Sequence, residues 1–268
     1  MAPVEILLTD VDGTLVTQAK ELTPGTVAAA RRLREAGVQL AVTSGRPPRG
    51  MASLVEPLDL TTPIAAFNGG LIVRPDMSVI EQRVLPAGIV EPAIDLLDRS
   101  GLDVWAYSGA DWLVRDAAGA HVAHEAGTVG FGPTVVESFG ALSDVAKLVG
   151  VSDDHELVGA ATAKARETLG DHVSASQSQP YYLDITHPRA NKGEVVSFLS
   201  ATLGIAPERF ATIGDMPNDV LMFARSGLSI AMGNAAREVQ RAARRVTTSN
   251  EDEGFARAVE RFVLPAGA

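Results

Sequence analysis

Short apolar runs and amphipathic stretches alternate over the first third of the chain. The apolar run Ile6–Leu8 predicts a buried strand, and Val38–Thr43 predicts a second one. Between them, Thr23 followed by Pro24 is typical of the start of a helix, and Gly37 is typical of its end. A strand, a helix and a second strand in this order predict a βαβ unit with a right-handed connection.

The same alternation continues at Ile64–Phe67 and returns in the last third of the chain. There, Lys192–Leu203 predicts a helix that ends at Gly204, and Phe210–Ile213 and Ser229–Ala231 predict two further strands. Strands that alternate with helices in this way form a mostly parallel sheet with helices on both faces. We therefore predict an α/β fold whose Rossmann-like parallel-sheet core is built from both ends of the chain.

The middle third has a different pattern, with several short strands and fewer helices between them. The predicted helices are Val90–Leu97 and Glu156–Leu169, and the predicted strands are Val104–Tyr107, Trp112–Arg115, Ala146–Val151, Val173–Ser176 and Tyr181–Ile185. This pattern predicts an α+β cap with an antiparallel sheet, inserted into the core. We place the core at residues 1–84 plus 187–268 and the cap at residues 85–186, where it can act as a lid over the strand ends.

Two carboxylates follow the first predicted strand, in the stretch Asp10-Val11-Asp12-Gly13-Thr14-Leu15. Because residues i and i+2 of an extended chain point the same way, Asp10 and Asp12 can face one pocket, and Gly13 lets the chain turn away behind them. Two carboxylates in one pocket repel each other unless a cation lies between them, which favours a divalent metal. A strand that ends in an ordinary Asx-type turn is the alternative interpretation.

A second acidic segment, Gly214-Asp215-Met216-Pro217-Asn218-Asp219, also follows a predicted strand. If the two strands are neighbours, Asp215 and Asp219 join Asp10 and Asp12 in one crevice. Several carboxylates without a balancing His or Cys suit Mg²⁺, which prefers oxygen ligands. Taken alone, the segment is equally typical of a turn rich in Asn, Asp and Pro.

Other predicted strand and helix ends carry groups that can bind a phosphoryl group. Thr43 offers a hydroxyl, Ser44 and Gly45 offer backbone N–H groups, and Lys192 opens a helix, where an ammonium group and the helix dipole both favour an anion. An exposed lysine at a helix start is the ordinary interpretation of Lys192 alone. Its occurrence together with the two acidic segments favours phosphate binding.

Composition narrows the classes of partner and compartment. The formal net charge of −10 disfavours nucleic acid and anionic membranes, and the chain has no cysteine for a disulfide, a zinc-thiolate site or a thiol nucleophile. Neither a leader-like N-terminus nor an apolar stretch long enough to span a membrane is evident. We expect a soluble cytoplasmic protein that is a monomer or a homodimer, without a nucleic-acid or membrane partner.

Three further groups of residues have simpler structural interpretations. His121 and His124 have the spacing of a helical metal pair but are expected to be surface histidines. The aromatic side chains of the cap are expected to be half-buried in its sheet, and the basic stretch Arg237–Arg245 is expected to be the solvated face of an amphipathic helix. The aromatic residues are Trp105, Tyr107 and Trp112.

Together, the motifs resemble those of the haloacid dehalogenase-like (HAD) hydrolases, specifically the Cof-type subfamily IIB phosphatases. The matching segments are Asp10-Val11-Asp12-Gly13-Thr14, Thr43-Ser44-Gly45-Arg46, Asn191-Lys192-Gly193, Gly214-Asp215-Met216-Pro217-Asn218-Asp219 and Ile230-Ala231-Met232-Gly233-Asn234-Ala235. They occur in the order of the family, with a cap-sized insertion between the second and the third. The resemblance covers the core, which is about two thirds of the chain, and implies the HAD fold.

The resemblance also implies roles for individual residues. Asp10 would be the nucleophile that forms an aspartyl-phosphate, and Asp12 the general acid and base. Mg²⁺ would be bound by the Asp10 side chain, the backbone carbonyl of Asp12 and Asp215. Asp219 would orient Lys192 or a metal-bound water. The phosphate would be bound by Thr43, Ser44, Lys192 and Asn218. The residues that would face the substrate are Arg46, Asn68 and Asn191.

The sequence thus predicts a Mg²⁺-dependent phosphatase of a small phosphorylated metabolite, for example a sugar phosphate. A phosphomutase with the same aspartyl-phosphate is a close alternative, and accumulation of inorganic phosphate would distinguish the two. A non-catalytic phospho-acceptor or metal-binding regulator is an alternative of another class, because Asp, Mg²⁺, Thr and Lys also occur together in receiver domains. Asp12 and the cap disfavour it, because a receiver needs neither.

Overall fold

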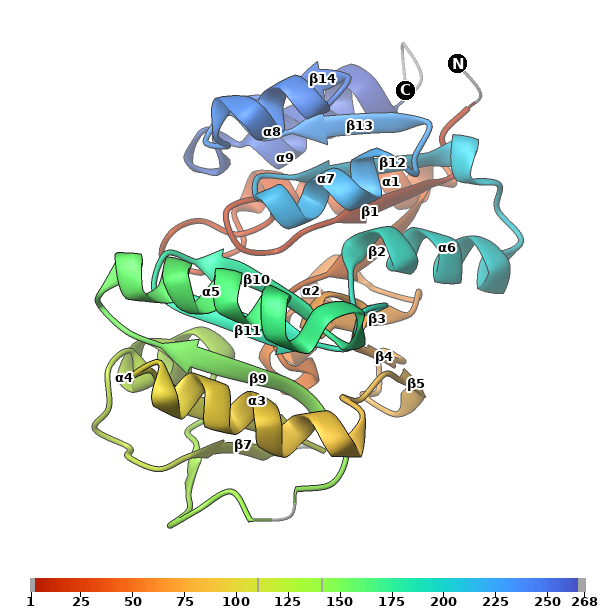
Figure 1. Cartoon of the computed structure of the whole chain (residues 1–268). Helices are drawn as coiled ribbons and strands as arrows, with labels where there is room; N and C mark the ends of the chain where they lie inside the picture. Colours follow the sequence, from red (N-terminus) through yellow and green to blue (C-terminus); the bar gives the residue numbers. More distant parts are fainter. Residues whose placement is uncertain (1–2, 110, 141, 265–268) are drawn as a thin grey trace.

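The computed structural model of the chain describes residues 3–109, 111–140 and 142–264, in which the strands form two sheets (Figure 1). The first sheet has the strand order β14-β13-β12-β1-β2-β3-β4-β5. Six of its strands run parallel: β1 (Ile6–Thr9), β2 (Gln39–Thr43), β3 (Ile64–Ala66), β12 (Phe210–Gly214), β13 (Leu228–Ala231) and β14 (Arg245–Val246). Two antiparallel strands, β4 (Leu71–Val73) and β5 (Val79–Gln82), extend one edge. The predicted α/β fold is therefore confirmed.

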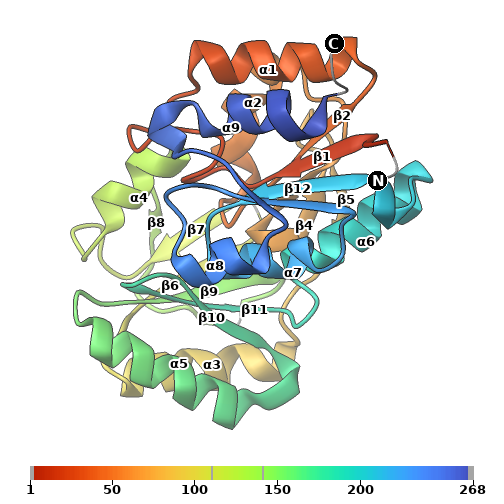
Figure 2. The same ribbon diagram turned by 90° about the horizontal axis from the view of Figure 1, so that it is seen from above.

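Helices cover both faces of this sheet, as Figure 2 shows. One face carries α1 (Pro24–Glu35), α2 (Ala52–Leu58) and α9 (Gly254–Ala258); the other carries α6 (Lys192–Leu203), α7 (Val220–Phe223) and α8 (Arg237–Ala242). Every residue of β1 is buried for this reason, and β1 lies between β12 and β2. Helix α1, which follows β1, and helix α6, which precedes β12, lie on opposite faces of the sheet, so a crevice forms at the carboxyl ends of β1 and β12, where open α/β sheets bind their ligands.

The second sheet has the order β10-β11-β9-β6-β7-β8 and is formed by the middle of the chain. Its strands are β6 (Asp103–Ser108), β7 (Asp111–Val114), β8 (Thr134–Val135), β9 (Val145–Val151), β10 (Ser174–Gln179) and β11 (Tyr182–Thr186). The helices of this part are α3 (Ala87–Arg99), α4 (Val122–Val129) and α5 (His155–Leu169). One detail of the prediction is wrong: the short β8, which the alternation does not reveal, pairs with β7 in parallel. The domain boundaries at residues 84/85 and 186/187 remain a prediction.

The two faces of the second sheet have different partners. Apolar residues such as Val104 and Leu183 pack with α3 and α5 on one face. The other face turns towards the first sheet, where the Tyr107 ring lies 5.1 Å from the ring of Phe67. The cap aromatics are therefore fully buried rather than half-buried: Trp105, Tyr107 and Trp112 are each 2% exposed or less. Their burial comes from the packing between the two sheets, which a strand pattern alone does not indicate.

The basic stretch Arg237–Arg245 is exposed as predicted, but the helix covers only its first six residues. Helix α8 ends at Ala242, and Ala243 is extended. The backbone N–H of Arg244 donates to the Ser229 hydroxyl at 3.0 Å, and Arg245 pairs with Ile230 as part of an edge strand. Pairing with the sheet, a tertiary interaction, therefore overrides the local helical pattern.

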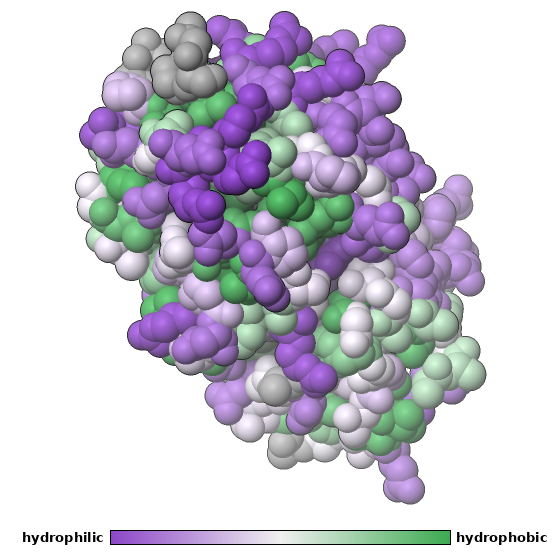
Figure 3. All heavy atoms as spheres, turned by 180° about the vertical axis from the view of Figure 1, so that it is seen from behind, coloured by the Kyte–Doolittle hydropathy of each residue, from purple (hydrophilic) through white to green (hydrophobic). Residues whose placement is uncertain are grey.

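The surface mixes hydrophilic and hydrophobic residues. On the face seen in Figure 3, hydrophobic residues occur in small patches among hydrophilic ones. Within the described ranges, none of the helices is both long and apolar enough to cross a membrane.

Candidate active site

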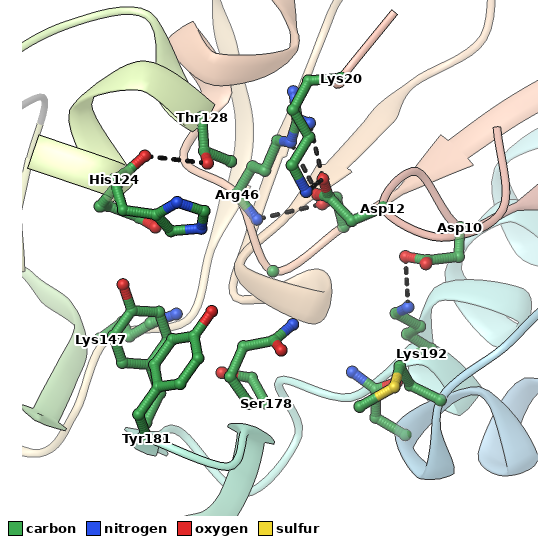
Figure 4. Close-up of a pocket in the computed structure, with 17 residues that line it drawn as sticks. Asp10, Asp12, Lys20, Arg46, His124, Thr128, Lys147, Ser178, Tyr181 and Lys192 are labelled. Carbon is green, nitrogen blue, oxygen red and sulfur yellow. Dashed lines mark hydrogen bonds and ion pairs between the residues drawn. The ribbon is translucent and has the colours of Figure 1, made fainter. Parts of the chain in front are cut away.

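The carboxyl ends of β1, β2 and β12 border a cavity of about 180 Å³, which the second sheet and α4 close from the opposite side (Figure 4). The first sheet and its loops contribute Asp10, Asp12, Lys20, Ser44, Gly45, Arg46, Lys192, Met216 and Asn218. The second sheet and its helices contribute His124, Glu125, Thr128, Lys147, Ser178, Gln179, Tyr181 and Tyr182. The cavity thus lies between parts of the chain that are far apart in sequence.

Lys192 connects two carboxylates at the closed end of this cavity. Its Nζ donates to Asp10 Oδ1 and to Asp219 Oδ1, at 2.6 Å each, and its side chain is 2% exposed. Burial opposes the charge of the ammonium group, but Asp10 and Asp219 outweigh it and raise the pKa of Lys192. Burial also raises the pKa of Asp10 well above its usual value, although Lys192 opposes the shift. Lys192 is therefore a buried site residue and not an exposed helix-start lysine.

Asp219 fixes the loop after β12. Its Oδ2 accepts hydrogen bonds from the backbone N–H groups of Asp215 and Met216, at 2.8 Å each, while its Oδ1 binds Lys192. A side chain at Gly214 would place Cβ only 2.3 Å from Cγ of Asp219, so glycine is required there. Asp219 thus contacts both Lys192 and the backbone of Asp215.

Asp215 lies beside Asp10 and has no cationic partner among the described residues. The Thr14 hydroxyl donates to its Oδ1 at 3.0 Å, and burial followed by the charge of Asp219 raises the pKa of Asp215 to about 6. One carboxylate oxygen from each of Asp10, Asp215 and Asp219 lies within 4.8 Å of the others. Since Asp219 uses both its oxygens, Asp10 and Asp215 remain available to a cation that prefers oxygen ligands.

Asp12 is held by two cations at the mouth of the crevice (Figure 4). Nε and Nη2 of Arg46 donate to its two oxygens at 2.7 Å each, and Nζ of Lys20 donates to Oδ1 at 2.6 Å. Burial favours the neutral acid, but Arg46 and Lys20 lower the pKa of Asp12 to about 2. In this arrangement Asp12 is ionised and cannot donate a proton.

These ion pairs predict an acid-sensitive contribution of Asp12 to stability. The unfolded pKa of an Asp is about 3.9, whereas the folded value is about 2. A lowered folded-state pKa stabilises the native state above the unfolded pKa, and this contribution is lost as the pH falls from about 4 to about 2. We expect the wild type to lose about 2 kcal/mol in this window and Arg46→Met to lose much less, as measured by urea unfolding at each pH. Equal losses in the two proteins would contradict this assignment.

Of the predicted phosphate-binding residues, Ser44, Lys192 and Asn218 line the cavity, whereas Thr43, at the end of β2, is buried and is not one of the lining residues. The Thr43 hydroxyl and Asn218 Oδ1 are buried without a hydrogen-bond partner among the described residues. Ser44 Oγ accepts from the N–H of Arg46 at 3.1 Å, and Ser44 lines the cavity. Buried polar groups without a partner are costly in a folded protein, which indicates that a polar ligand completes this site.

Two of the residues expected to face the substrate do not line the cavity. Asn191 caps α6: its Oδ1 accepts from the N–H of Glu194 at 3.0 Å, and its Nδ2 donates to the Pro188 carbonyl. Asn68 lies behind Asn218 and accepts from its Nδ2 at 3.3 Å. In this structure the Asn191 side chain therefore serves the helix cap, and Asn68 contacts the cavity residue Asn218. A role of either in substrate binding remains a prediction. Arg46 lines the cavity as predicted.

Several residues that line the cavity could not be predicted as site residues from the sequence patterns. Lys20 follows the first acidic motif, and the residues on the opposite wall come from the second sheet and α4. His121 stacks on Tyr181 with ring centroids 4.0 Å apart and binds Asp153 rather than a metal partner, whereas His124 lines the cavity. The interpretation of His124 as merely a surface residue is thus incomplete. Isolated polar residues on short strands cannot be assigned to a cavity before the two sheets are placed together.

Comparison with protein families matches residues 7–259 to the haloacid dehalogenase-like hydrolases. The chain belongs to this family. Among curated proteins, it is 25% identical over 269 residues to the 5-amino-6-(5-phospho-D-ribitylamino)uracil phosphatase YitU of Bacillus subtilis, covering 96% of this chain and 97% of that protein. A second B. subtilis phosphatase with the same named substrate, YwtE, is also 25% identical, covering 95% of this chain and 96% of that protein.

Solved HAD-like structures confirm the fold. A haloacid dehalogenase-like hydrolase from Bacteroides thetaiotaomicron superposes with a TM-score of 0.86 at 27% identity, covering 96% of this chain and 99% of the other. The HAD subclass IIB sugar phosphatase BT4131 superposes with a TM-score of 0.85 at 20% identity, covering 97% and 99%. The sequence-based assignment to the HAD-like hydrolases, with their parallel-sheet core, is thus confirmed.

Proposed function

We propose that the chain is a Mg²⁺-dependent phosphatase that hydrolyses a small phosphorylated metabolite through an aspartyl-phosphate on Asp10. The observation that carries this proposal is the placement of Asp10, which lies at the end of β1, bonded to Lys192 and lining the cavity. Asp215 lies beside it, and Thr43 and Asn218 supply buried polar groups without a partner in the described residues. This is a nucleophile with groups for a metal and an anion around it.

The donor set fits Mg²⁺. Asp10 and Asp215 supply carboxylate oxygens without a competing His or Cys, and the backbone carbonyl of Asp12 is the third proposed ligand. When bound, the ion would reduce the repulsion between the Asp10 carboxylate and an incoming phosphate. The raised pKa values of Asp10 and Asp215 support this assignment, because both carboxylates lack sufficient positive charge when no metal is present.

The reaction proceeds in two steps at phosphorus. An Asp10 oxygen attacks phosphorus, the ester P–O bond breaks, and the leaving oxygen takes a proton from Asp12. Asp12 then accepts a proton from the water that attacks phosphorus, which cleaves the acyl phosphate, releases inorganic phosphate and restores the Asp10 carboxylate. Lys192, Ser44 and Asn218 hold the phosphoryl oxygens throughout, because they lie around Asp10 at the same strand ends.

For Asp12 to donate a proton, its ion pairs must open. The substrate phosphate is the natural competitor, because a dianion bound beside Asp10 attracts Arg46 and Lys20, which line the same cavity, away from Asp12. A carboxyl freed from these cations and placed beside an anion has a higher pKa than about 2, which suits a general acid. In this scheme, substrate binding itself prepares Asp12 to donate.

The cavity size and the relatives favour a small substrate with several hydroxyl groups. About 180 Å³ is small compared with pockets for drug-sized ligands, which span roughly 300–1,000 Å³. YitU and YwtE carry the names of phosphatases for a ribityl phosphate, and BT4131 is described as a sugar phosphatase. We infer a sugar phosphate or polyol phosphate as the substrate class.

The direct test is phosphate release from a panel of sugar, polyol and aryl phosphate esters, with Mg²⁺ and with chelator. We expect stoichiometric release of inorganic phosphate that depends on Mg²⁺. Conversion of one sugar phosphate into its isomer without phosphate accumulation would identify a phosphomutase instead. Absence of turnover with every ester, in the presence of Mg²⁺, would contradict the proposal.

Metal binding by Asp215 can be tested through the stability of the wild type and of Asp215→Asn, with and without Mg²⁺. In the metal-free protein, the folded-state pKa of about 6 lies above the unfolded value, so the native state loses stability as the pH rises from about 4 to about 6. We expect metal-free Asp215→Asn to be more stable than the metal-free wild type at pH 7, by about 2 kcal/mol. Added Mg²⁺ should raise the melting temperature of the wild type and leave that of Asp215→Asn nearly unchanged. The opposite order would contradict metal binding by Asp215.

A further inference from the structure

The wall of the cavity opposite Asp10 is a built polar site. Figure 4 shows Lys147 and Tyr181 on this wall, across the cavity from Asp10 and Lys192. Lys147 stands on β9, and its Nζ lies 3.0 Å from Asp184 Oδ2 on β11. The residues of this wall belong to the second sheet, to the turn between β10 and β11 or to α4, so the wall faces the part of a substrate that leaves, not the phosphoryl group.

Buried polar atoms on this wall lack partners. Tyr182 is 6% exposed and lines the cavity, and its hydroxyl has no hydrogen-bond partner among the described residues. Oδ1 of the neighbouring Asp184 is likewise buried and unpartnered within the described ranges. A buried hydroxyl that borders a cavity and has no internal partner indicates that a ligand supplies one.

The charges of this wall do not balance. The Lys147 ammonium is already paired with Asp184, and both side chains are at most 7% exposed. Glu125 on α4 lines the same end of the cavity, and among the described residues it accepts a hydrogen bond from a neutral donor, the Tyr107 hydroxyl, at 3.0 Å from Oε1. Lys20 and Arg46, at the mouth of the cavity, are both bonded to Asp12. If the buried Asp184, which does not itself line the cavity, is counted with the wall, the wall carries two carboxylates and one ammonium group.

We propose that this wall recognises leaving groups that carry hydroxyl or amine donors, and that Glu125 excludes leaving groups that carry a second anion. The inference rests on the proposed phosphatase function, and it narrows the substrate class. Glu125 accepts from a hydroxyl or ammonium group, while the Tyr182 hydroxyl pairs with a further oxygen of the same molecule. A carboxylate or second phosphate at this position would lie against Glu125 in a partly desolvated cavity, where like charges repel strongly.

The test compares kcat/KM for matched esters that differ at the end distant from the phosphate. In glucose 6-phosphate, here called the neutral ester, the part that leaves is uncharged. In glucosamine 6-phosphate it carries an amine, and in 6-phosphogluconate it carries a carboxylate. We expect the wild type to prefer the neutral and amine esters over the carboxylate ester by about 100-fold. In Glu125→Gln, which keeps the size and an acceptor for Tyr107, this preference should fall by about tenfold or more.

Two control variants separate charge from structure. Tyr107→Phe removes the hydrogen bond to Glu125 but keeps its charge, so the preference should persist. Glu167→Gln removes an exposed carboxylate on α5, behind the sheet, and should change nothing. The inference is overturned if the wild type hydrolyses the carboxylate ester as well as the neutral one, a result that needs no variant. It is equally overturned if Glu125→Gln keeps the full preference; absence of turnover with every ester would instead overturn the phosphatase function on which it rests.

Discussion

Asp10→Asn should abolish phosphate release, lowering kcat by at least about 10⁴-fold with every ester that the wild type hydrolyses. The amide is nearly the same size as the carboxylate, but it is a far weaker nucleophile. Asp10 bonds to Lys192 at 2.6 Å and lines the cavity. Among the described residues, no other carboxylate does both. Phosphate release in single-turnover and steady-state assays with Mg²⁺ measures the effect.

Two further measurements make this result specific to chemistry. The circular dichroism spectrum of Asp10→Asn should match that of the wild type, because Lys192 keeps Asp219 as an ionic partner. Asp171→Asn, an exposed aspartate on the far side of the cap, is the matched control and should retain full activity. Metal-dependent turnover at the wild-type rate in Asp10→Asn would exclude Asp10 as the nucleophile.

Lys192→Met should destabilise the fold by about 3–5 kcal/mol as well as inactivate the enzyme. The substitution leaves the buried carboxylates of Asp10 and Asp219 without their shared cation, and both side chains are at most 7% exposed. Removing one partner of a buried ion pair is costly, because the remaining charge stays desolvated. The midpoint of urea unfolding, with the slope of the transition held equal, measures the loss.

Added Mg²⁺ shows whether Lys192→Met loses stability because of unbalanced charge or because of altered packing. If the loss arises from uncompensated carboxylates, added Mg²⁺ should restore part of the stability of Lys192→Met, because the ion places positive charge beside Asp10. Lys164→Met, on the exposed face of α5, is the matched control and should unfold within about 0.5 kcal/mol of the wild type. A Lys192→Met protein as stable as the wild type without metal would contradict the buried three-residue ion cluster.

Much of the fold follows from local patterns. The strands that carry Asp10 and Asp215 are short apolar runs between turn residues, and α6 occupies the predicted range Lys192–Leu203 because Asn191 caps its start and Gly204 ends it in a left-handed conformation. Because parallel strands present their carboxyl ends at one edge of the sheet, the sequence alone predicts that the side chains at these ends lie close together. The family resemblance alone predicts a contact of Asp219 with Lys192, and the structure has this ion pair.

The rest depends on tertiary contacts that no local pattern contains. Arg46 is recognisable as part of a motif, but its pairing with Asp12 requires β1 and β2 to be adjacent. Lys20 reaches the same carboxylate from the loop between β1 and α1. Asn191 is a polar residue in a family motif, which is typical of a site residue. Only the structure shows that its amide oxygen accepts the capping hydrogen bond of α6. Glu125 and Lys147 stand on short elements of the cap, and only the packing of the two sheets shows that they line the cavity.

The central claim, a covalent phosphoryl group on Asp10, is tested most directly by trapping it. Asp12→Ala should be mixed with an aryl phosphate and Mg²⁺ and quenched in acid, because a phenolate leaves without the proton that Asp12 supplies. Since the second step still lacks its base, the intermediate should accumulate. The account predicts that the peptide containing Asp10 gains one phosphoryl group, which Asp10→Asn with Asp12→Ala does not. Release of the phenol at a measurable rate without phosphorylation of that peptide, or with phosphorylation of another residue, would contradict it.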